Sequence, residues 1–289
     1  MKLAISTYSF YRWRNERKKT IEDSIDVIAK LDVAGVEFAG LDRLDADGTP
    51  KRAAALRKYA EKRKLEVAGY CTGAELFVPP SQQRNAVARL KREVDVAQAL
   101  GATKMRHDVT RGFGDWSKGV KGGNTFVTVL KTVVPAIREV ADYAAQRGVR
   151  TSLENHGFYL QTPDRVEKLL KAVDHENFGL TLDMGNFLCA EADPIAAVKQ
   201  LLRYAQIVHA KDFHVRSKKA MPPTGWFATP GTTALRGAIV GHGVIDIAAQ
   251  IRFLKSKRYD GFLSLEFEGM EEPIEGVRLG VDYLRNLLA

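Results

Sequence analysis

Short apolar runs of strand type alternate regularly along this chain with amphipathic helical patterns. The strand-like runs occupy residues 2–7, 35–39, 65–71, 103–107, 151–155, 178–183, 206–211 and 262–267. The helical patterns occupy residues 20–32, 49–62, 82–100, 126–146, 163–173, 194–204, 246–256 and 273–288. Strands that alternate with helices form parallel sheets built of right-handed βαβ units. Eight such units in 289 residues, without a linker or a break in composition, predict an α/β fold: a single-domain (β/α)8 TIM barrel over residues 1–289.

Composition and charge narrow the class of protein. Hydrophobic residues make up 45% and charged residues 27% of the chain, as in ordinary soluble domains. The net charge of +9 is spread over the predicted helices, so we expect a solvated surface and no nucleic-acid partner. Cys71 and Cys189 do not make a disulfide framework, and neither a signal-peptide pattern nor a membrane-length apolar run is present. The sequence therefore predicts a cytoplasmic protein without a membrane partner.

Four polar residues close predicted strands: Glu154, Asp183, His209 and Glu266. The first two intervals between them, 29 and 26 residues, match the ~30 residues of one βαβ unit. In a β/α barrel the carboxyl ends of the strands form the catalytic face. A polar side chain where a buried strand ends is costly unless it has a partner. Three carboxylates and one imidazole meeting there predict a site for a divalent metal ion.

The segments around these residues read LENHG at Glu154, LDMGN at Asp183, HAKD from His209 and SLEFEG at Glu266. In this order the chain resembles, over essentially its whole length, the xylose isomerase-like superfamily of sugar isomerases and epimerases. That group includes ketose 3-epimerases, inosose-pathway enzymes and endonuclease IV. The resemblance implies that the four residues bind one divalent ion. Mn²⁺ is the expected ion, and Mg²⁺, Co²⁺ and Zn²⁺ remain open because the ligand types do not choose among them.

The resemblance also implies a sugar isomerase or epimerase that acts on a ketose or keto-sugar derivative. The metal would stabilise an enediolate, while Glu154 and Glu266 act as the catalytic acid and base on opposite sides of the substrate. A keto-glycoside lyase would use the same metal site, so the ligands do not separate elimination from epimerisation. An endonuclease IV-like hydrolase is a further alternative. The chain has only six histidines, too few for the histidine-rich zinc cluster of that enzyme.

Further residues are candidates for substrate binding, and the small-molecule partner would be a sugar or sugar derivative. Many relatives carry a histidine at the place of Asn186, so this position leaves the substrate's identity open. A helix cap, an ion pair with Asp212 and a structural histidine are the alternative roles of Asn186, Lys211 and His107 respectively. Glu37 either pairs with basic neighbours or contacts a ligand. The full set of predicted substrate contacts is His107, His156, Asn186, Lys211, Arg216 and Trp226.

Two long segments without a predicted element follow strands at the catalytic face. Residues 108–125 include Trp116, and residues 213–244 include Trp226 and Phe227. Long loops inside compact domains usually serve as lids or binding loops. We therefore expect extended loops over the mouth of the barrel. A homo-oligomer is compatible with this sequence, which shows no readable interface.

Overall fold

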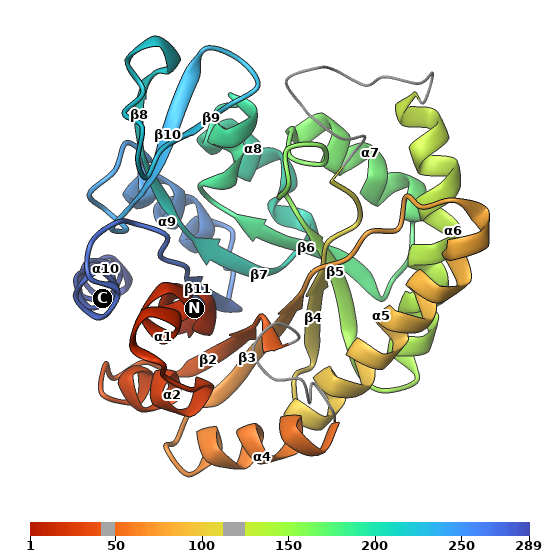
Figure 1. The fold of residues 1–289 in the computed structure, drawn as a ribbon, viewed down its shortest axis with the longest axis horizontal. Coiled ribbons are helices and arrows are strands. Elements are labelled where there is room, and N and C mark those ends of the chain that lie inside the picture. Colours follow the sequence, from red (N-terminus) through yellow and green to blue (C-terminus); the bar gives the residue numbers. More distant parts are fainter. Residues whose placement is uncertain (42–49, 112–124) are drawn as a thin grey trace.

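The computed structural model describes residues 1–41, 50–111 and 125–289. Parallel strands within these ranges close into a barrel that helices surround, which confirms the predicted fold class (Figure 1). Around the barrel the order is β1, β11, β7, β6, β5, β4, β3 and β2. In chain order these strands are β1 (Lys2–Ser6), β2 (Gly35–Ala39), β3 (Glu66–Thr72), β4 (Lys104–His107), β5 (Arg150–Glu154), β6 (Phe178–Asp183), β7 (Ala205–Ala210) and β11 (Phe262–Leu265).

The predicted helices are present with bounds shifted by a few residues. They are α2 (Ile21–Ala29), α4 (Pro50–Glu61), α5 (Pro80–Leu100), α6 (Phe126–Ala145), α7 (Pro163–Val173), α8 (Pro194–Leu201), α9 (Ile247–Ser256) and α10 (Pro273–Leu288). Helix α2 begins at a capping box, in which the Asp23 N–H donates to Thr20 Oγ1 and the Thr20 N–H donates to Asp23 Oδ2. No described helix is both long enough and apolar enough to cross a membrane.

Helix α1 (Tyr11–Arg17) was not predicted from the sequence. Its buried residue is a cation, Arg14, which donates to the Thr7 carbonyl oxygen at 2.6 Å and to Ser24 Oγ at 3.0 Å. A helix that buries an arginine lacks the apolar stripe by which amphipathic helices are recognised. From the sequence alone this segment is therefore recognised as a basic run and not as a helix.

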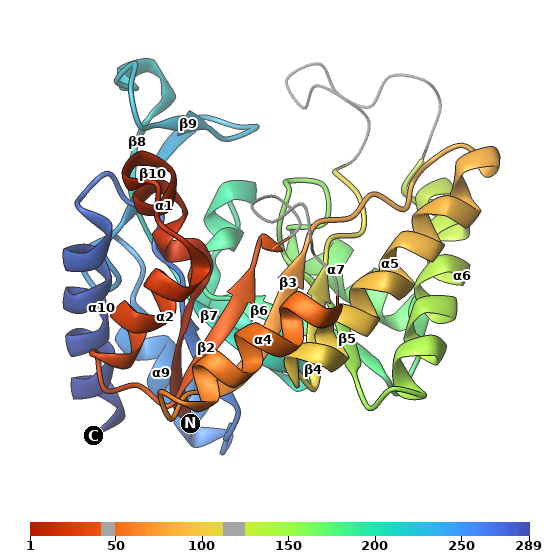
Figure 2. The same cartoon turned by 60° about the horizontal axis from the view of Figure 1, so that its bottom comes forward.

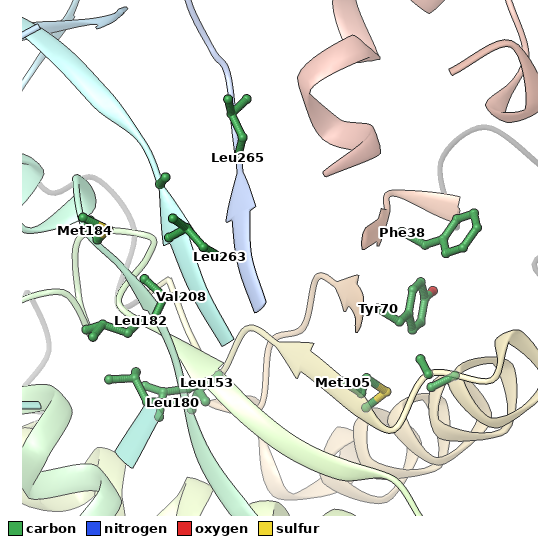
Figure 3. Close-up of a cluster of buried hydrophobic side chains, with 14 of the residues drawn as sticks. Phe38, Tyr70, Met105, Leu153, Leu180, Leu182, Met184, Val208, Leu263 and Leu265 are labelled. Carbon is green, nitrogen blue, oxygen red and sulfur yellow. The ribbon is translucent and has the colours of Figure 1, made fainter. Parts of the chain in front are cut away.

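Strand alternation decides which side chains face the inside of the barrel. Successive residues of a strand point to opposite faces. Figure 3 shows the outward apolar side chains, among them Leu153, Leu182 and Val208, all of which are buried. The residues that follow them point inward and include Glu154 and Asp183. The same alternation that builds the core therefore directs the polar strand ends toward one another.

The segment 213–244, in which no element was predicted, contains an antiparallel sheet. The sheet consists of β8 (Asp212–Ser217), β10 (Thr233–Ala238) and β9 (Phe227–Ala228), with β10 in the middle. Figure 2 shows these strands projecting beyond the barrel. The alternation of apolar and polar residues in FHVRS was the available signal, but the glycine, proline and threonine residues between the strands obscured it. Most of the other predicted loop, residues 112–124 with Trp116, lies outside the described residues.

Two carboxylates hold this sheet in place. Asp212 accepts the backbone N–H groups of Phe213, Gly241, Gly243 and Ile245 at 2.8–3.2 Å. Its carboxylate is thus an anchor for backbone rather than an ion-pair partner of Lys211. Glu191 accepts from the side chains and backbone of the β9–β10 turn at 2.7–2.9 Å. These hydrogen bonds lower the pKa of Glu191 to about 2, so this anchor stays ionised at neutral pH.

Candidate active site and metal centre

The four residues predicted at the strand ends lie together inside one end of the barrel. Glu154 ends β5, Asp183 ends β6, His209 lies in β7 and Glu266 follows β11. Each offers one ligand atom, and these atoms all lie within 4.8 Å of one another. Because β6 and β7 stand between β5 and β11, Asp183 and His209 lie between the two glutamates. We call these four residues the acidic cluster.

Two atoms of the acidic cluster are buried without a hydrogen bond among the described residues, namely Asp183 Oδ2 and His209 Nδ1. They are 4.0 Å apart, and Nδ1 also lies 3.4 Å from Glu154 Oε1 and 4.0 Å from Glu266 Oε2. Burying a polar atom without a partner costs free energy. A cation held between these atoms would remove that cost. The residues present therefore fit a divalent ion bound by three carboxylates and one imidazole.

The other oxygen of Asp183 is fully engaged. Oδ1 accepts the backbone N–H groups of Gly185 and Asn186, both at 2.7 Å. Asn155 fixes the backbone of Asp183, since its side chain accepts the Asp183 N–H at 2.9 Å and donates to the Asp183 carbonyl oxygen at 3.0 Å. Burial raises the pKa of Asp183 to about 6 against the opposing charge of Lys211. The second carboxylate oxygen, Oδ2, is thus held toward the centre of the cluster.

Glu37, at the middle of β2, contacts the ring nitrogen of His209 that does not face the acidic cluster. The distance from His209 Nε2 to the Glu37 carboxylate is 3.0 Å, and Ser264 Oγ donates to Glu37 Oε2 at 2.8 Å. Burial alone would lower the pKa of His209, but the charge of Glu37 and further hydrogen bonds raise it well above its usual value. A carboxylate on one ring nitrogen sets the tautomer and the orientation of the other. Of the two roles left open for Glu37 by the sequence, the structure shows pairing with a histidine.

Lys211 places a buried ammonium group among the carboxylates. Its Nζ lies 2.5 Å from Glu266 Oε2, 3.5 Å from Asp183 Oδ2 and 3.6 Å from Glu268 Oε2. These charges raise the pKa of Lys211 well above its usual value although burial opposes the shift. Asn186 joins the two sides of the site, because it donates to Glu154 Oε1 at 3.1 Å and accepts from Lys211 at 3.4 Å.

Arg106 is a buried cation of this site that the sequence analysis missed. Its guanidinium forms an ion pair with Glu154 and lies 3.0 Å from Asp108 Oδ1. Asp108 in turn lies 3.2 Å from Nδ1 of His156, whose ring is partly exposed. Burial opposes ionisation of His156, yet the hydrogen bond to Asp108 raises its pKa. Alternation along KMRH was the signal that Arg106 faces inward when Met105 faces the core.

His107 was predicted to contact the substrate, and the structure places it elsewhere. It lies on the same face of β4 as Met105, fully buried, with its ring centroid 6.0 Å from that of Phe178. Its Nδ1 is 2.8 Å from the Asp108 carbonyl oxygen, and burial lowers its pKa to about 4. The strand's alternation therefore gives the inward position to Arg106 and a structural role to His107.

Arg216 and Trp226 also lie apart from the acidic cluster, although both were predicted as substrate contacts. Arg216 is exposed on β8, with its guanidinium carbon 5.5 Å from the centroid of the Trp226 ring. Arg236 lies 5.7 Å from the same ring. Neither Arg216 nor Trp226 lines any of the three cavities around the cluster. The antiparallel sheet explains this, because it turns these side chains away from the mouth while Phe227 lines two of the cavities.

Three adjoining cavities lined by described residues open around the cluster. The catalytic cavity, of about 100 Å³, is lined by Glu154, Glu266, Arg106, Lys211 and His156. A second, of about 320 Å³, lies between β9 and the segment formed by α1 and the preceding 3-10 helix η1 (Thr7–Phe10). The third, of about 250 Å³, lies beneath the antiparallel sheet. Glu268 lines all three, so they meet at this residue.

Comparison with known proteins places this site in context. A sequence model described as "Xylose isomerase-like TIM barrel" matches residues 25–287. A protein named inosose dehydratase from Clostridium botulinum (strain Alaska E43 / Type E3) is 21% identical over 290 aligned positions, which cover 94% of this chain and 93% of that protein. These matches extend over the barrel strands that carry the acidic cluster.

Solved structures share the fold at lower identity. A D-psicose 3-epimerase with D-tagatose from Clostridium cellulolyticum H10 superposes with a TM-score of 0.75 and 18% identity, covering 100% of this chain and 99% of that one. The IOLI protein, solved with a binding zinc atom, gives a TM-score of 0.76 and 17% identity, covering 100% of this chain and 98% of that one. At these identities the likeness establishes the fold alone.

Proposed function

Because this chain belongs to the xylose isomerase-like TIM barrel family, we propose that it is a divalent-metal-dependent sugar isomerase or epimerase. The substrate would be a ketose or a keto-sugar derivative. The observation that carries this proposal is the acidic cluster, in which Asp183 Oδ2 and His209 Nδ1 are buried 4.0 Å apart without a hydrogen bond among the described residues. Three carboxylates and one imidazole suit several divalent ions, and we propose Mn²⁺.

The bound cation would act as a Lewis acid that polarises a substrate carbonyl and acidifies the neighbouring C–H. Glu154 and Glu266 then serve as the proton-transferring pair, since they flank the other two members of the cluster. Arg106 holds the pKa of Glu154 well below its usual value despite burial, which keeps this carboxylate ionised as a base. Lys211 and Asn186 would bind substrate oxygens. The four-residue donor set does not resemble a histidine-rich zinc cluster, which argues against the endonuclease.

Elimination is the second candidate reaction, and the pair His156–Asp108 favours it. His156 lies in the catalytic cavity with Asp108 on its Nδ1, and its pKa is raised. A histidine that holds a proton near neutral pH can deliver it to a departing oxygen. Curated relatives such as the C. botulinum protein are named as dehydratases, and dehydration is an elimination.

Deuterium exchange tests the proposal. The Mn²⁺-loaded protein would be incubated in D₂O with free ketoses, ketose phosphates and 3-keto-glycosides, and products would be followed by NMR. We expect deuterium at a carbon next to the carbonyl together with an epimer or isomer. Loss of water or of an aglycone would identify elimination instead. A protein that binds Mn²⁺ tightly and exchanges no compound of the panel would contradict proton transfer altogether.

Removing the carboxylate behind His209 should weaken cation binding. In Glu37→Gln the amide no longer supplies the charge that orients and polarises the imidazole, so we expect Mn²⁺ affinity to fall by about 10–100-fold. Isothermal titration calorimetry measures this directly. Ser264→Ala, which removes only the hydroxyl that donates to Glu37, is the milder control. Unchanged affinity in Glu37→Gln would show that Glu37 does not support a metal ligand.

Cation binding should weaken as the pH falls. The folded-state pKa of Asp183 is about 6, above its usual 3.8, so this ligand is protonated below about pH 6. His209, whose pKa is raised, must also lose its proton before binding. Mn²⁺ titrations from pH 8 to pH 5 should show falling affinity throughout, with a steeper fall below pH 6. A flat profile would contradict this assignment of protons. The stability of the metal-free protein should change in the opposite direction. It should rise as the pH falls from about 6 to about 4, because the folded state then binds a proton at Asp183 that the unfolded state does not bind.

A further inference from the structure

The cavity beneath the antiparallel sheet has an aromatic wall built from three segments that are distant in sequence. Phe158 follows β5, Phe213 lies in β8 and Phe227 lies in β9. The ring centroids of Phe158 and Phe227 are 6.3 Å apart and those of Phe213 and Phe227 are 6.0 Å apart, both pairs nearly edge to face. Phe158 and Phe227 remain partly exposed to this cavity. We call this space the aromatic cavity.

The backbone at Phe158 is held in an uncommon conformation that positions its ring. Phe158 has φ of 65°, a left-handed value that bulky L residues rarely adopt. Its N–H donates to Gln161 Oε1 at 2.6 Å, and Gln161 Nε2 donates to the Asn186 carbonyl oxygen at 2.7 Å. Such strain is characteristic of ligand-binding segments, where the surrounding structure enforces it. The aromatic cavity is therefore a built feature connected to Asn186 in the catalytic site.

The aromatic cavity opens directly onto the catalytic cavity, since His156, Lys211 and Glu268 line both. The polar groups at this junction already bind one another, as Lys211 lies 3.6 Å from Glu268 and contacts Asn186. A second sugar ring would need hydrogen bonds for its hydroxyl groups. The wall beyond the junction offers phenylalanine rings, the buried Cys189 and Gln161, whose amide is already bonded to Phe158 and Asn186. The chemistry of the lining favours a flat apolar group.

The volume of the aromatic cavity agrees with a flat apolar occupant. The aromatic cavity measures about 250 Å³, and an apolar cavity of about 150 Å³ is enough to bind benzene. The catalytic cavity is smaller, at about 100 Å³. A substrate that spans both cavities would have its sugar at the acidic cluster and its apolar substituent against Phe227.

We propose that the substrate is a keto-sugar that carries an aromatic substituent, as in an aryl glycoside, with that substituent bound in the aromatic cavity. This inference rests on the proposed function for the sugar end of the site. Phe158, Phe213 and Phe227 are its specificity-determining residues.

Binding of unreactive glycosides tests this proposal without turnover. Phenyl and methyl β-D-glucopyranoside, neither of which has a carbonyl group, would be titrated into the Mn²⁺-loaded protein and followed by ligand-observed NMR. We expect the phenyl compound to bind at least about tenfold more tightly, the gain from burying one aromatic ring. Equal affinities, or no detectable binding of the phenyl compound, would overturn the proposal. Tighter binding of cellobiose than of the phenyl glycoside would overturn the aromatic assignment.

Variants assign the preference to the aromatic cavity. Phe227→Ala and Phe158→Ala should each reduce the phenyl-to-methyl affinity ratio toward 1. Phe253→Ala on α9 removes an equally large, partly buried ring outside the cavity and should keep the wild-type ratio. An equal loss in all three variants would contradict the assignment. Deuterium exchange on the keto-sugar without a phenyl preference would defeat this inference alone, and a phenyl preference without exchange would defeat only the proposed function.

Discussion

Replacing Glu154 by glutamine should reduce deuterium exchange on the keto-sugar substrate by about 10²–10⁴-fold, the usual contribution of a positioned general base. The amide keeps the size of the side chain but can neither accept the substrate proton nor pair with Arg106 as a charge. Glu266→Gln should behave alike, because this residue is proposed to return the proton from the other side. NMR exchange rates at saturating Mn²⁺ measure the effect, and circular dichroism reports whether the fold is retained.

A carboxylate at the opposite end of the barrel strands provides the matched control. Glu66 opens β3, is about half exposed and pairs with Lys2 at 2.7 Å. Glu66→Gln should therefore exchange at the wild-type rate. If Glu154→Gln or Glu266→Gln keeps full exchange activity with Mn²⁺ bound, the two-carboxylate mechanism is incorrect.

Replacing Lys211 by methionine should destabilise the metal-free protein by about 3–5 kcal/mol, as is typical when one partner of a buried ion pair is removed. The buried carboxylates of Glu266 and Asp183, with the more exposed Glu268 beside them, would then lack their nearest cation. Mn²⁺ supplies positive charge to the same carboxylates, so adding it should recover part of the loss. Urea unfolding with and without Mn²⁺ measures both quantities.

The variant Lys2→Met tests whether the burial of the Lys211 ion pairs causes the expected loss of stability. Lys2 also forms an ion pair, but its side chain and that of Glu66 are 53% and 54% exposed. Exposed pairs contribute little, so we expect a loss below about 1 kcal/mol that Mn²⁺ does not reverse. Similar losses in Lys2→Met and Lys211→Met would contradict the account of Lys211 as a buried countercharge.

The barrel could be predicted because the strand and helix patterns are local and repeat along the chain. The antiparallel sheet could not be recognised so readily, since β9 has only two residues and its pairing with β10 depends on contacts across the turn. Helix α1 was missed for a different reason, because it buries Arg14 rather than an apolar stripe. In both cases tertiary contacts, which a local pattern does not carry, decide the structure.

The acidic cluster followed from the sequence because strand ends of a closed barrel converge whatever the details of packing. The cations around it did not, since Arg106 meets Glu154 only through the pairing of β4 with β5. His107 was chosen for its residue type, while the alternation along β4 favoured its neighbour. Arg216 and Trp226 were assigned to a loop over the mouth, and the sheet that replaces this loop places them outside.

Strand β8 begins at Asp212, two positions after β7 ends at Ala210, so the barrel strand that holds His209 runs almost directly into the covering sheet. At the inner end of this sheet Asp212 joins β8 to the segment that follows β10, whereas the β9–β10 turn is held by Glu191. The acidic cluster thus lies on the barrel strands, whereas the covering sheet is a separate segment whose sequence can vary. For protein engineering, libraries confined to residues 217–233 offer a route to new substrate ranges while the reactive groups keep their positions.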